Sequence, residues 1–224
     1  MPAFPSEFPG YAELHCLSNF SFLRGASHPE ELVEQAAAQG YAALALTDEC
    51  SLAGVVRGHR AARAAGLKFI VGSEMVLADG LKLVVLACNR AGYGNLSALV
   101  TLGRRRAEKG RYRLTRGDLE SLAPSGAVPD CLVLWVPGVA PAPEDGAWLA
   151  ERFPGRAWIA AELHAGPDDG ARIEALRELA ATSGLPVAAA GDVHMHVRAR
   201  RPVQDVLTAL RLRTTVFAAG YALF

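Results

Sequence analysis

The feature that most constrains this chain is a series of short, continuous apolar runs, each followed by acidic or histidine side chains. The runs cover residues 12–14, 42–47, 67–73, 157–161 and 186–191, and the side chains after them are His15, Asp48, Glu49, Glu74, Glu162, His164, Asp192 and His194. Such a run is typical of a parallel strand buried on both faces. The pattern therefore predicts buried strands whose carboxyl ends carry imidazoles and carboxylates, the groups that a metal site needs.

The order of the predicted elements indicates the fold class. Strands are expected at residues 11–16, 42–47, 67–72, 81–88, 131–136, 157–162 and 186–190. Helices are expected at residues 29–39, 52–65, 93–103, 168–183 and 202–213. Regular strand–helix alternation favours a parallel sheet with helices outside it. Seven repeats with a polar rim favour a closed or nearly closed barrel, with chemistry at the carboxyl ends of its strands. An open doubly wound sheet is the alternative, although the sequence has neither a G-x-x-x-x-G-K nor a G-x-G-x-x-G motif.

Composition narrows the class of protein further. The chain has 224 residues, 51% of them hydrophobic, and equal numbers of basic and acidic residues at 23 each. Its bulk charge therefore attracts neither nucleic acid nor an acidic membrane. The four cysteines form no C-x-x-C pair, which is typical of a reducing compartment. The sequence has no signal-peptide pattern and no run near the ~18 apolar residues that span a bilayer, so we expect a cytoplasmic protein that does not contact a membrane.

The last residues predict that the chain is a piece of something longer. A helix is expected at residues 202–213, and the apolar residues 214–224 then follow without a further strand or helix to cover them. The alternative is a tail that folds back on the barrel.

Each candidate ligand has a structural alternative. Asp192 and His194 lie two residues apart after a strand and could serve one ion, or could cap and pack instead. His15 could equally be a core histidine. Glu74 is costly to bury without a cation or hydrogen-bond donors, which favours a functional role. Asp48 could cap the following helix. His164 is ambiguous because a helix is expected to start close by.

A basic stretch at residues 104–116 raises the question of nucleic-acid contact. It holds six arginines and a lysine around Tyr112, a composition that can follow a phosphate backbone. Neighbouring acidic residues, Glu108, Asp118 and Glu120, dilute its charge. A solvated loop is the alternative.

Several ordered motifs resemble a known family. Residues 11–25 (Tyr-Ala-Glu-Leu-His-Cys-Leu-Ser-Asn-Phe-Ser-Phe-Leu-Arg-Gly) look like the opening of a bacterial C-family replicative polymerase. Residues 45–54 (Ala-Leu-Thr-Asp-Glu-Cys-Ser-Leu-Ala-Gly), 66–74 (Gly-Leu-Lys-Phe-Ile-Val-Gly-Ser-Glu) and 191–194 (Gly-Asp-Val-His) are similar to its error-prone branch. These motifs, with ligands at strand ends, resemble the PHP (polymerase and histidinol phosphatase) domain.

The resemblance implies a distorted seven-stranded (β/α)7 barrel of the PHP type at residues 1–201. Residues 202–224 would begin the segment that leads to a polymerase body outside this chain. The parent enzyme implied is an error-prone DNA-directed DNA polymerase, used in damage-tolerant synthesis and repair. It would hold Mg²⁺ and DNA in its polymerase body, and work with a sliding clamp and mutagenesis accessory proteins.

Departures from the family pattern weaken the metal site. Active members of the superfamily begin with a His-x-His pair, but Leu17 occupies its second position, and Asn19 replaces the acidic residue usual shortly after it. Glu49 replaces a histidine that commonly follows the second motif, and Lys82 stands where active relatives offer another. Leucine cannot ligate, and an ammonium group repels a cation. The remaining candidates for one or two zinc, manganese or iron ions are His15, Asp48, Glu74, Asp192 and His194, with Glu49 and His164 as additions.

Three functions follow from these expectations. The first is the N-terminal barrel of an error-prone polymerase, which should not polymerise DNA by itself. The second is a metal-dependent phosphoesterase or 3′-end-trimming nuclease, which needs a more complete ligand set. The third is an interaction module for polymerase accessory proteins. The unfinished tail favours the first.

Overall fold

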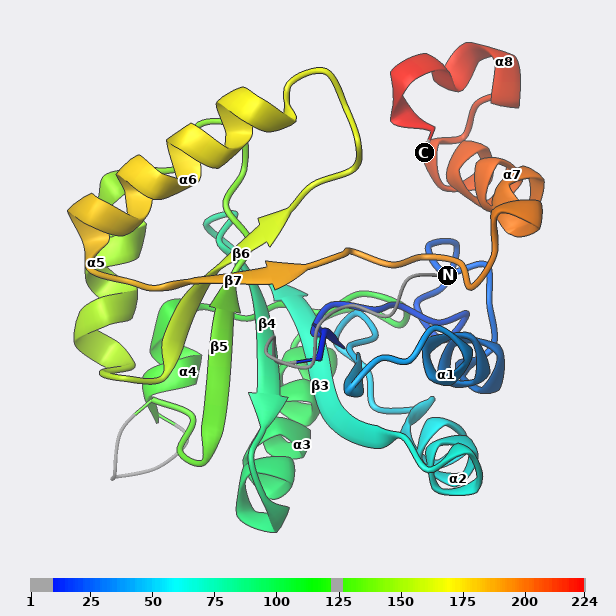
Figure 1. The fold of residues 1–224 in the computed structure, drawn as a ribbon. Helices are drawn as coiled ribbons and strands as arrows, with labels where there is room; N and C mark the ends of the chain where they lie inside the picture. The colour runs from blue at the N-terminus through cyan, green and yellow to red at the C-terminus, as the bar shows by residue number, and fades with distance from the viewer. Residues whose placement is uncertain (1–9, 122–126, 224) are drawn as a thin grey trace.

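The computed structural model describes residues 10–121 and 127–223, and this part of the chain contains a seven-stranded sheet (Figure 1). The strands are β1 (Ala12–Glu13), β2 (Ala43–Leu46), β3 (Lys68–Val76), β4 (Lys82–Ala87), β5 (Cys131–Trp135), β6 (Ala157–Glu162) and β7 (Val187–Ala190). They lie side by side in chain order from β1 to β7. The predicted α/β barrel with seven strands is confirmed.

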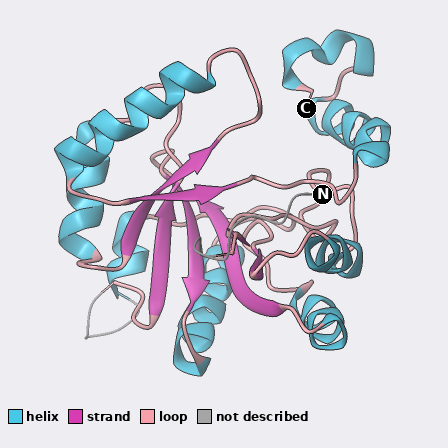
Figure 2. Cartoon of the chain, viewed as in Figure 1, coloured by secondary structure: helices cyan, strands magenta, loops and turns pink. Residues whose placement is uncertain are grey.

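The helices lie around the outside of this sheet (Figure 2). They are α1 (Pro29–Ala38), α2 (Val55–Ala65), α3 (Arg90–Arg105), α4 (Arg116–Ser121), α5 (Pro143–Arg152), α6 (Asp169–Ser183), α7 (Arg201–Leu212) and α8 (Val216–Ala219), with 3₁₀ turns at Arg198–Arg200 and Gly220–Ala222. The predicted helices correspond to α1, α2, α3, α6 and α7, within a few residues at each end. The short helices α4, α5 and α8 were not predicted, and α8 corrects the expectation that residues 214–224 contain no further helix. None of the described helices is long and apolar enough to cross a membrane.

The expectation of a parallel sheet is wrong at β4, which runs antiparallel to both β3 and β5. The cause is the short connection around Asp79 and Gly80. Leu77 and Leu81 are joined by a backbone hydrogen bond of 2.9 Å, and Gly80 has a positive φ of 94°. A parallel pair needs a crossover of about a dozen residues or more, so this tight turn can only reverse the chain. The hairpin also extends β3 to Val76, past the predicted end at residue 72.

The seam between β1 and β7 is held by few bonds. The predicted strand at 11–16 is reduced to Ala12–Glu13, and Cys16 rejoins the sheet through an isolated parallel bridge to Val193. The buried Glu13 carboxylate strengthens the seam, because its Oε1 accepts hydrogen bonds from the backbone N–H of His15 (2.9 Å) and of Gly191 (2.8 Å). A side chain at position 191 would overlap this carboxylate. The barrel is therefore nearly closed, with one glutamate bridging its ends.

Alternation along the strands divides the core into an inner and an outer layer. Val84 and Leu86 of β4 face the barrel interior with Leu134 of β5, whereas Leu83 and Val85 pack outward against the helices. Because successive strand residues point to opposite faces, Lys82 shares the interior face with Val84 and Leu86. The interior is thus apolar toward one end and charged at the other.

We predict that two glycines two residues apart on α3 respond in opposite ways to substitution by alanine. A Cβ at Gly92 would overlap the backbone carbonyl oxygen of Asp130, whereas a Cβ at Gly94 meets nothing within 4 Å. Gly92→Ala should therefore destabilise the fold by about 1–3 kcal/mol, and Gly94→Ala should stabilise it by about 0.5–1 kcal/mol. Urea unfolding measures both. Equal effects of the two substitutions would contradict the close approach of α3 to the Asp130 backbone.

Candidate metal centre

The centre of the candidate site is Glu74, whose side chain is fully buried. It lies within β3 opposite Val84 of β4, so it faces the barrel interior. Its Oε2 is 2.9 Å from Nε2 of His15, 3.0 Å from Nζ of Lys82 and 3.1 Å from Nη2 of Arg24. Nη1 of Arg24 also donates a hydrogen bond to Oε1. One buried carboxylate therefore meets three cationic groups.

These contacts keep Glu74 ionised. Burial by itself would raise the pKa of this carboxyl group, but hydrogen bonds from His15 and Arg24 and the charge of Lys82 hold the pKa well below its usual range. A buried carboxylate without such partners would carry a large desolvation cost. The cations of this chain therefore supply the compensation that a bound metal ion could otherwise give.

His15 connects Glu74 to two further carboxylates. Its Nδ1 is 2.6 Å from Oε1 of Glu162 and 3.5 Å from Oδ1 of Asp192. Burial disfavours the charged imidazolium, but the hydrogen bonds with Glu162 and Glu74 outweigh it and raise the pKa of His15 to about 9. In this arrangement both ring nitrogens donate to carboxylates. His15 is therefore a third cation at the centre.

Asp192 and His194 extend the cluster beyond β7. Nε2 of His194 is 3.1 Å from Oδ1 of Asp192, and Nδ1 of His194 is 3.1 Å from the backbone carbonyl of Arg24. Burial opposes ionisation of Asp192, but His194, His15 and Lys82 together lower its pKa from the ordinary value. Asp192 has a φ of 47°, in the left-handed region that aspartate tolerates better than most residues. The chain turns there, so that both side chains reach the rim.

The described residues contain one group suited to a metal ion: His15, Glu162 and Asp192, with one ligand atom from each within 4.8 Å of the others. One nitrogen and two carboxylate oxygens suit a single divalent ion. They do not fit a larger cluster, because Glu74 is held by Arg24 and Lys82. Lys82 also acts electrostatically on Asp192 and Glu162. The donor set therefore fits at most one ion, in competition with the cations of the chain itself.

Asp48 and Glu49 lie apart from this group. Asp48 is buried, and its carboxylate accepts hydrogen bonds from the backbone N–H of Ser18 and from the hydroxyls of Ser18 and Ser21, each at 2.8 Å. Glu49 is 2.9 Å from Nη1 of Arg24 and is partly exposed. Both carboxylates thus hold the loop that carries Arg24. Their predicted role as metal ligands stays a prediction, and in this structure their side chains contact the loop at residues 18–24.

His164 also lies outside the cluster. It is exposed, beyond the end of β6, and lines a surface pocket with Glu162, Asp168 and Arg172. Of the seven predicted ligands, the structure brings four together around one point. These four are His15, Glu74, Asp192 and His194.

Two members of the cluster, Glu162 and Arg24, were not among the seven predicted ligands. Glu162 comes directly after the apolar run at residues 157–161 and ends a buried strand. The rule that selected His164 therefore also applied to Glu162. Arg24 had no comparable signal, because it lies in a loop between β1 and α1. The indirect clue was the need of a buried Glu74 for a cation.

The basic stretch at 104–116 mostly serves the fold. Arg104 donates to the backbone carbonyls of Cys50 and Glu49, Arg106 pairs with Asp118, and Arg116 pairs with Asp79 and Asp145. These guanidinium groups are engaged within the domain. The expectation of nucleic-acid contact therefore depends on the exposed residues Arg105, Lys109, Arg111 and Arg113.

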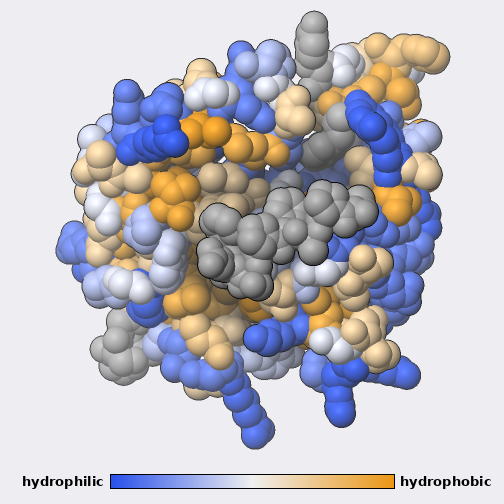
Figure 3. Space-filling model, in the orientation of Figure 1, coloured by the Kyte–Doolittle hydropathy of each residue, from blue (hydrophilic) through white to orange (hydrophobic). Residues whose placement is uncertain are grey.

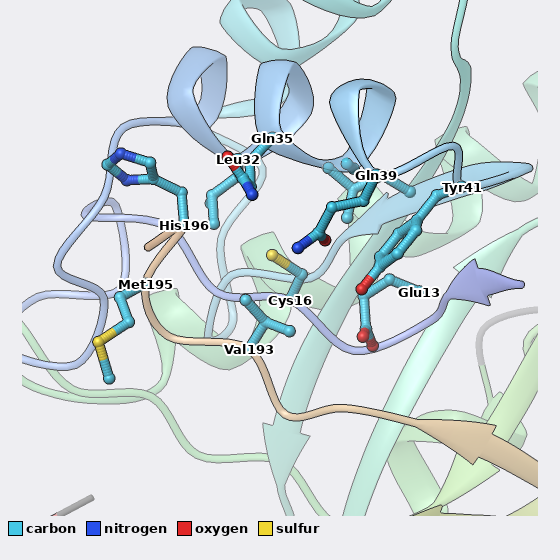
Figure 4. A pocket seen from close by; sticks show the side chains of 11 residues that line it. Glu13, Cys16, Leu32, Gln35, Gln39, Tyr41, Val193, Met195 and His196 are labelled. Atoms are coloured by element: carbon cyan, nitrogen blue, oxygen red, sulfur yellow. The ribbon is translucent and has the colours of Figure 1, made fainter. Parts of the chain in front are cut away.

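A separate cavity of about 210 Å³ lies between α1 and the seam of the barrel (Figure 4). Glu13, Cys16 and Tyr41 line it with Gln35 of α1 and with Gln39, which follows α1. The Glu13 carboxyl has a pKa raised by burial, against the hydrogen bonds that it accepts from His15, Gly191 and Tyr11. This cavity is on the outer side of the seam and shares none of its lining residues with the metal cluster.

Comparison with protein families places these features in context. The PHP domain family model matches residues 13–126. The chain is 75% identical over 216 residues to an error-prone DNA polymerase of Dechloromonas aromatica, and 59% identical over 240 residues to that of Azoarcus sp.. Each match covers 96% of this chain, but 21% and 23% of the respective polymerase. The chain thus spans about a fifth of the length of the curated relatives it matches.

Solved structures confirm the fold. An amidohydrolase from Chromobacterium violaceum matches with a TM-score of 0.59 at 16% identity, covering 82% of this chain and 87% of that one. A protein described as a metal-dependent phosphoesterase, from Bifidobacterium adolescentis, matches with a TM-score of 0.55 at 16% identity, covering 84% and 89%. A lesion-specific endonuclease from Pyrococcus furiosus matches at 0.54 and 14%, covering 84% and 49%. At these identities the likeness shows a shared fold.

We predict that Glu74→Gln destabilises the fold much more than Glu49→Gln. Loss of the buried charge leaves three cationic groups without their shared carboxylate, and breaking a buried ion pair costs about 3–5 kcal/mol. The Glu49 side chain is 30% exposed and also pairs with Arg24. A partly exposed pair contributes about 1 kcal/mol or less. Urea unfolding of both variants measures the difference, and equal destabilisation would contradict the central position of Glu74.

Proposed function

We propose that this chain, which belongs to the PHP domain family, is the N-terminal barrel of an error-prone DNA-directed DNA polymerase. The observation that carries the proposal is the 75% identity to such a polymerase along nearly the whole chain. The parent protein would copy damaged DNA during damage-tolerant synthesis and repair. Its setting would be the cytoplasm, in keeping with four cysteines that are all free.

The barrel itself would have a structural role. Arg24 and Lys82 form ion pairs with the Glu74 carboxylate, which a polynuclear metal site would use as a ligand. The cluster therefore stabilises the fold by ion pairs between buried side chains. Residues 1–201 would form this barrel, and residues 202–224 would begin the connection to the polymerase body.

Polymerisation would take place outside this chain. Nucleotidyl transfer uses carboxylates that hold two Mg²⁺ ions on the attacking and leaving oxygens, and these would belong to the polymerase body together with the DNA. A sliding clamp and mutagenesis accessory proteins would be the partners of the whole enzyme. The isolated chain should therefore not extend a primer.

A second candidate is a metal-dependent phosphoesterase or 3′-end-trimming nuclease. The observation in its favour is the group His15, Glu162 and Asp192, which could hold one zinc, manganese or iron ion. Such an ion would activate water and stabilise charge on a phosphate ester. Around it, Lys82 and Arg24 would contribute positive charge, and the groove lined by His164 and Arg172 would be open to a substrate.

We predict that the isolated chain has no primer-extension activity and does not hydrolyse phosphate esters, whereas the complete polymerase extends a primer past an abasic template site. Both assays are combined with two measurements on the isolated chain. One is its metal content after purification without chelator, and the other is its melting temperature before and after chelation. Less than one equivalent of metal and an unchanged melting temperature would favour the structural role. Stoichiometric metal with ester hydrolysis would favour the phosphoesterase, and a complete protein unable to extend any primer would contradict the proposed polymerase.

A further inference from the structure

Helix α7 is amphipathic in the opposite sense to an ordinary surface helix. A surface helix normally turns its apolar stripe toward the core. In α7, the side chains of Val203, Val206 and Leu210 are 43%, 48% and 58% exposed, whereas the buried residues are Gln204, Thr208 and the small Ala209. Residues 203, 206 and 210 share one helical face, and residues 204 and 208 share another. The polar side of α7 therefore faces the barrel and its apolar side faces outward.

The inward face of α7 is held by polar contacts near the ion-pair cluster. Nε2 of Gln204 donates a hydrogen bond of 2.7 Å to the backbone carbonyl of Arg24 and lies 3.4 Å from Nδ1 of His194. Among residues 10–121 and 127–223, Oε1 of Gln204 and Oγ1 of Thr208 have no hydrogen-bond partner. The buried apolar residue of α7 is the small Ala209, so hydrophobic burial contributes little to holding α7 on the barrel.

The outward face is part of a larger apolar surface. Phe217 of α8 is fully exposed, Phe22 in the loop before α1 is 84% exposed, and Phe22 lines a surface pocket of about 250 Å³ together with Val203. Figure 3 shows apolar residues gathered where Figure 1 places α8, with hydrophilic side chains beside them toward α7. We call Phe22, Val203, Val206, Leu210 and Phe217 the α7–α8 face. Exposed apolar side chains gathered on neighbouring elements in this way mark an interaction site.

We propose that the α7–α8 face is the docking surface for the polymerase segment that follows residue 224. This inference rests on the proposed function. The relatives that share this sequence are several times as long as this chain, and α7 and α8 stand apart from the sheet as the last helices of the described chain (Figure 1). A segment that continues from α8 reaches this face without a long linker, which keeps its effective concentration high.

The charges around the face favour this occupant over a second copy of the chain. Arg198, Arg211 and Arg213 lie on or next to α7, whereas Arg200 pairs with Glu31 and Nε of Arg201 is 3.8 Å from Oδ2 of Asp205. A symmetric dimer through this face would place the same arginines of both copies near one another, which is unfavourable. The occupant should therefore present an apolar centre rimmed by acidic side chains.

Amide hydrogen exchange of residues 201–219 tests the proposal in two proteins, this chain alone and the complete polymerase. Docking should slow exchange in the complete polymerase by on the order of tenfold or more, because a covered helix opens less often. Introducing Val206→Glu and Leu210→Glu together should return exchange to the rate of the isolated chain. The matched control is Val56→Glu, an exposed valine on α2 that should leave exchange unchanged.

The isolated chain and the complete polymerase, with and without these substitutions, also distinguish docking from the alternatives. Equal exchange rates in the two proteins would overturn the docking. A dimer of the isolated chain in light scattering, dissociated by Val206→Glu with Leu210→Glu, would assign the face to a second copy and also overturn it. Thermal melts of the isolated chain with and without the substitutions verify that it folds. Protection of residues 201–219 in a complete protein that extends no primer would support docking and contradict the proposed polymerase function alone.

Discussion

The structure depends on one buried negative charge, the carboxylate of Glu74. A carboxylate removed from water is stable only with compensating positive charge or hydrogen bonds. Here His15, Arg24 and Lys82 come from three separate places in the sequence and meet on its two oxygens. Through His15, the same network reaches Glu162 at the end of β6 and Asp192 after β7. The rim of the barrel is therefore held together by ion pairs between side chains.

This arrangement explains why the loop between β1 and α1 is ordered around the site. Asp48 binds the loop through Ser18 and Ser21, and Gln204 and His194 bind its Arg24 carbonyl from the other side. Arg24 is thus fixed at both its backbone and its guanidinium group. A loop fixed in this way connects the ion-pair cluster to α7, so that α7 contacts the site through its polar side and leaves its apolar side for another partner.

Much of the fold could be predicted from the sequence, because buried parallel strands and their helices have strong local signals. The runs before Asp48 and Asp192 and the helix expected at residues 29–39 are examples. The reversal of β4 was the main error, although the Asp79–Gly80 turn that causes it was visible. In the site, strand ends located His15 and Asp192. Arg24 could not be predicted in the same way, because long-range ion pairing has no local pattern, and neither could the role of Asp48, which depends on two serines about thirty residues earlier.

Calorimetric titration of this chain with Mn²⁺, compared with its Lys82→Met variant, tests most directly whether side-chain cations take the place of a metal cluster. We expect the natural chain to bind at most one ion, because Lys82 and Arg24 neutralise the carboxylates of the rim. Removal of the Lys82 ammonium should tighten binding by about tenfold or more, the equivalent of about 1.4 kcal/mol. Two or three ions bound by the natural chain, with an affinity that Lys82→Met does not change, would contradict the account.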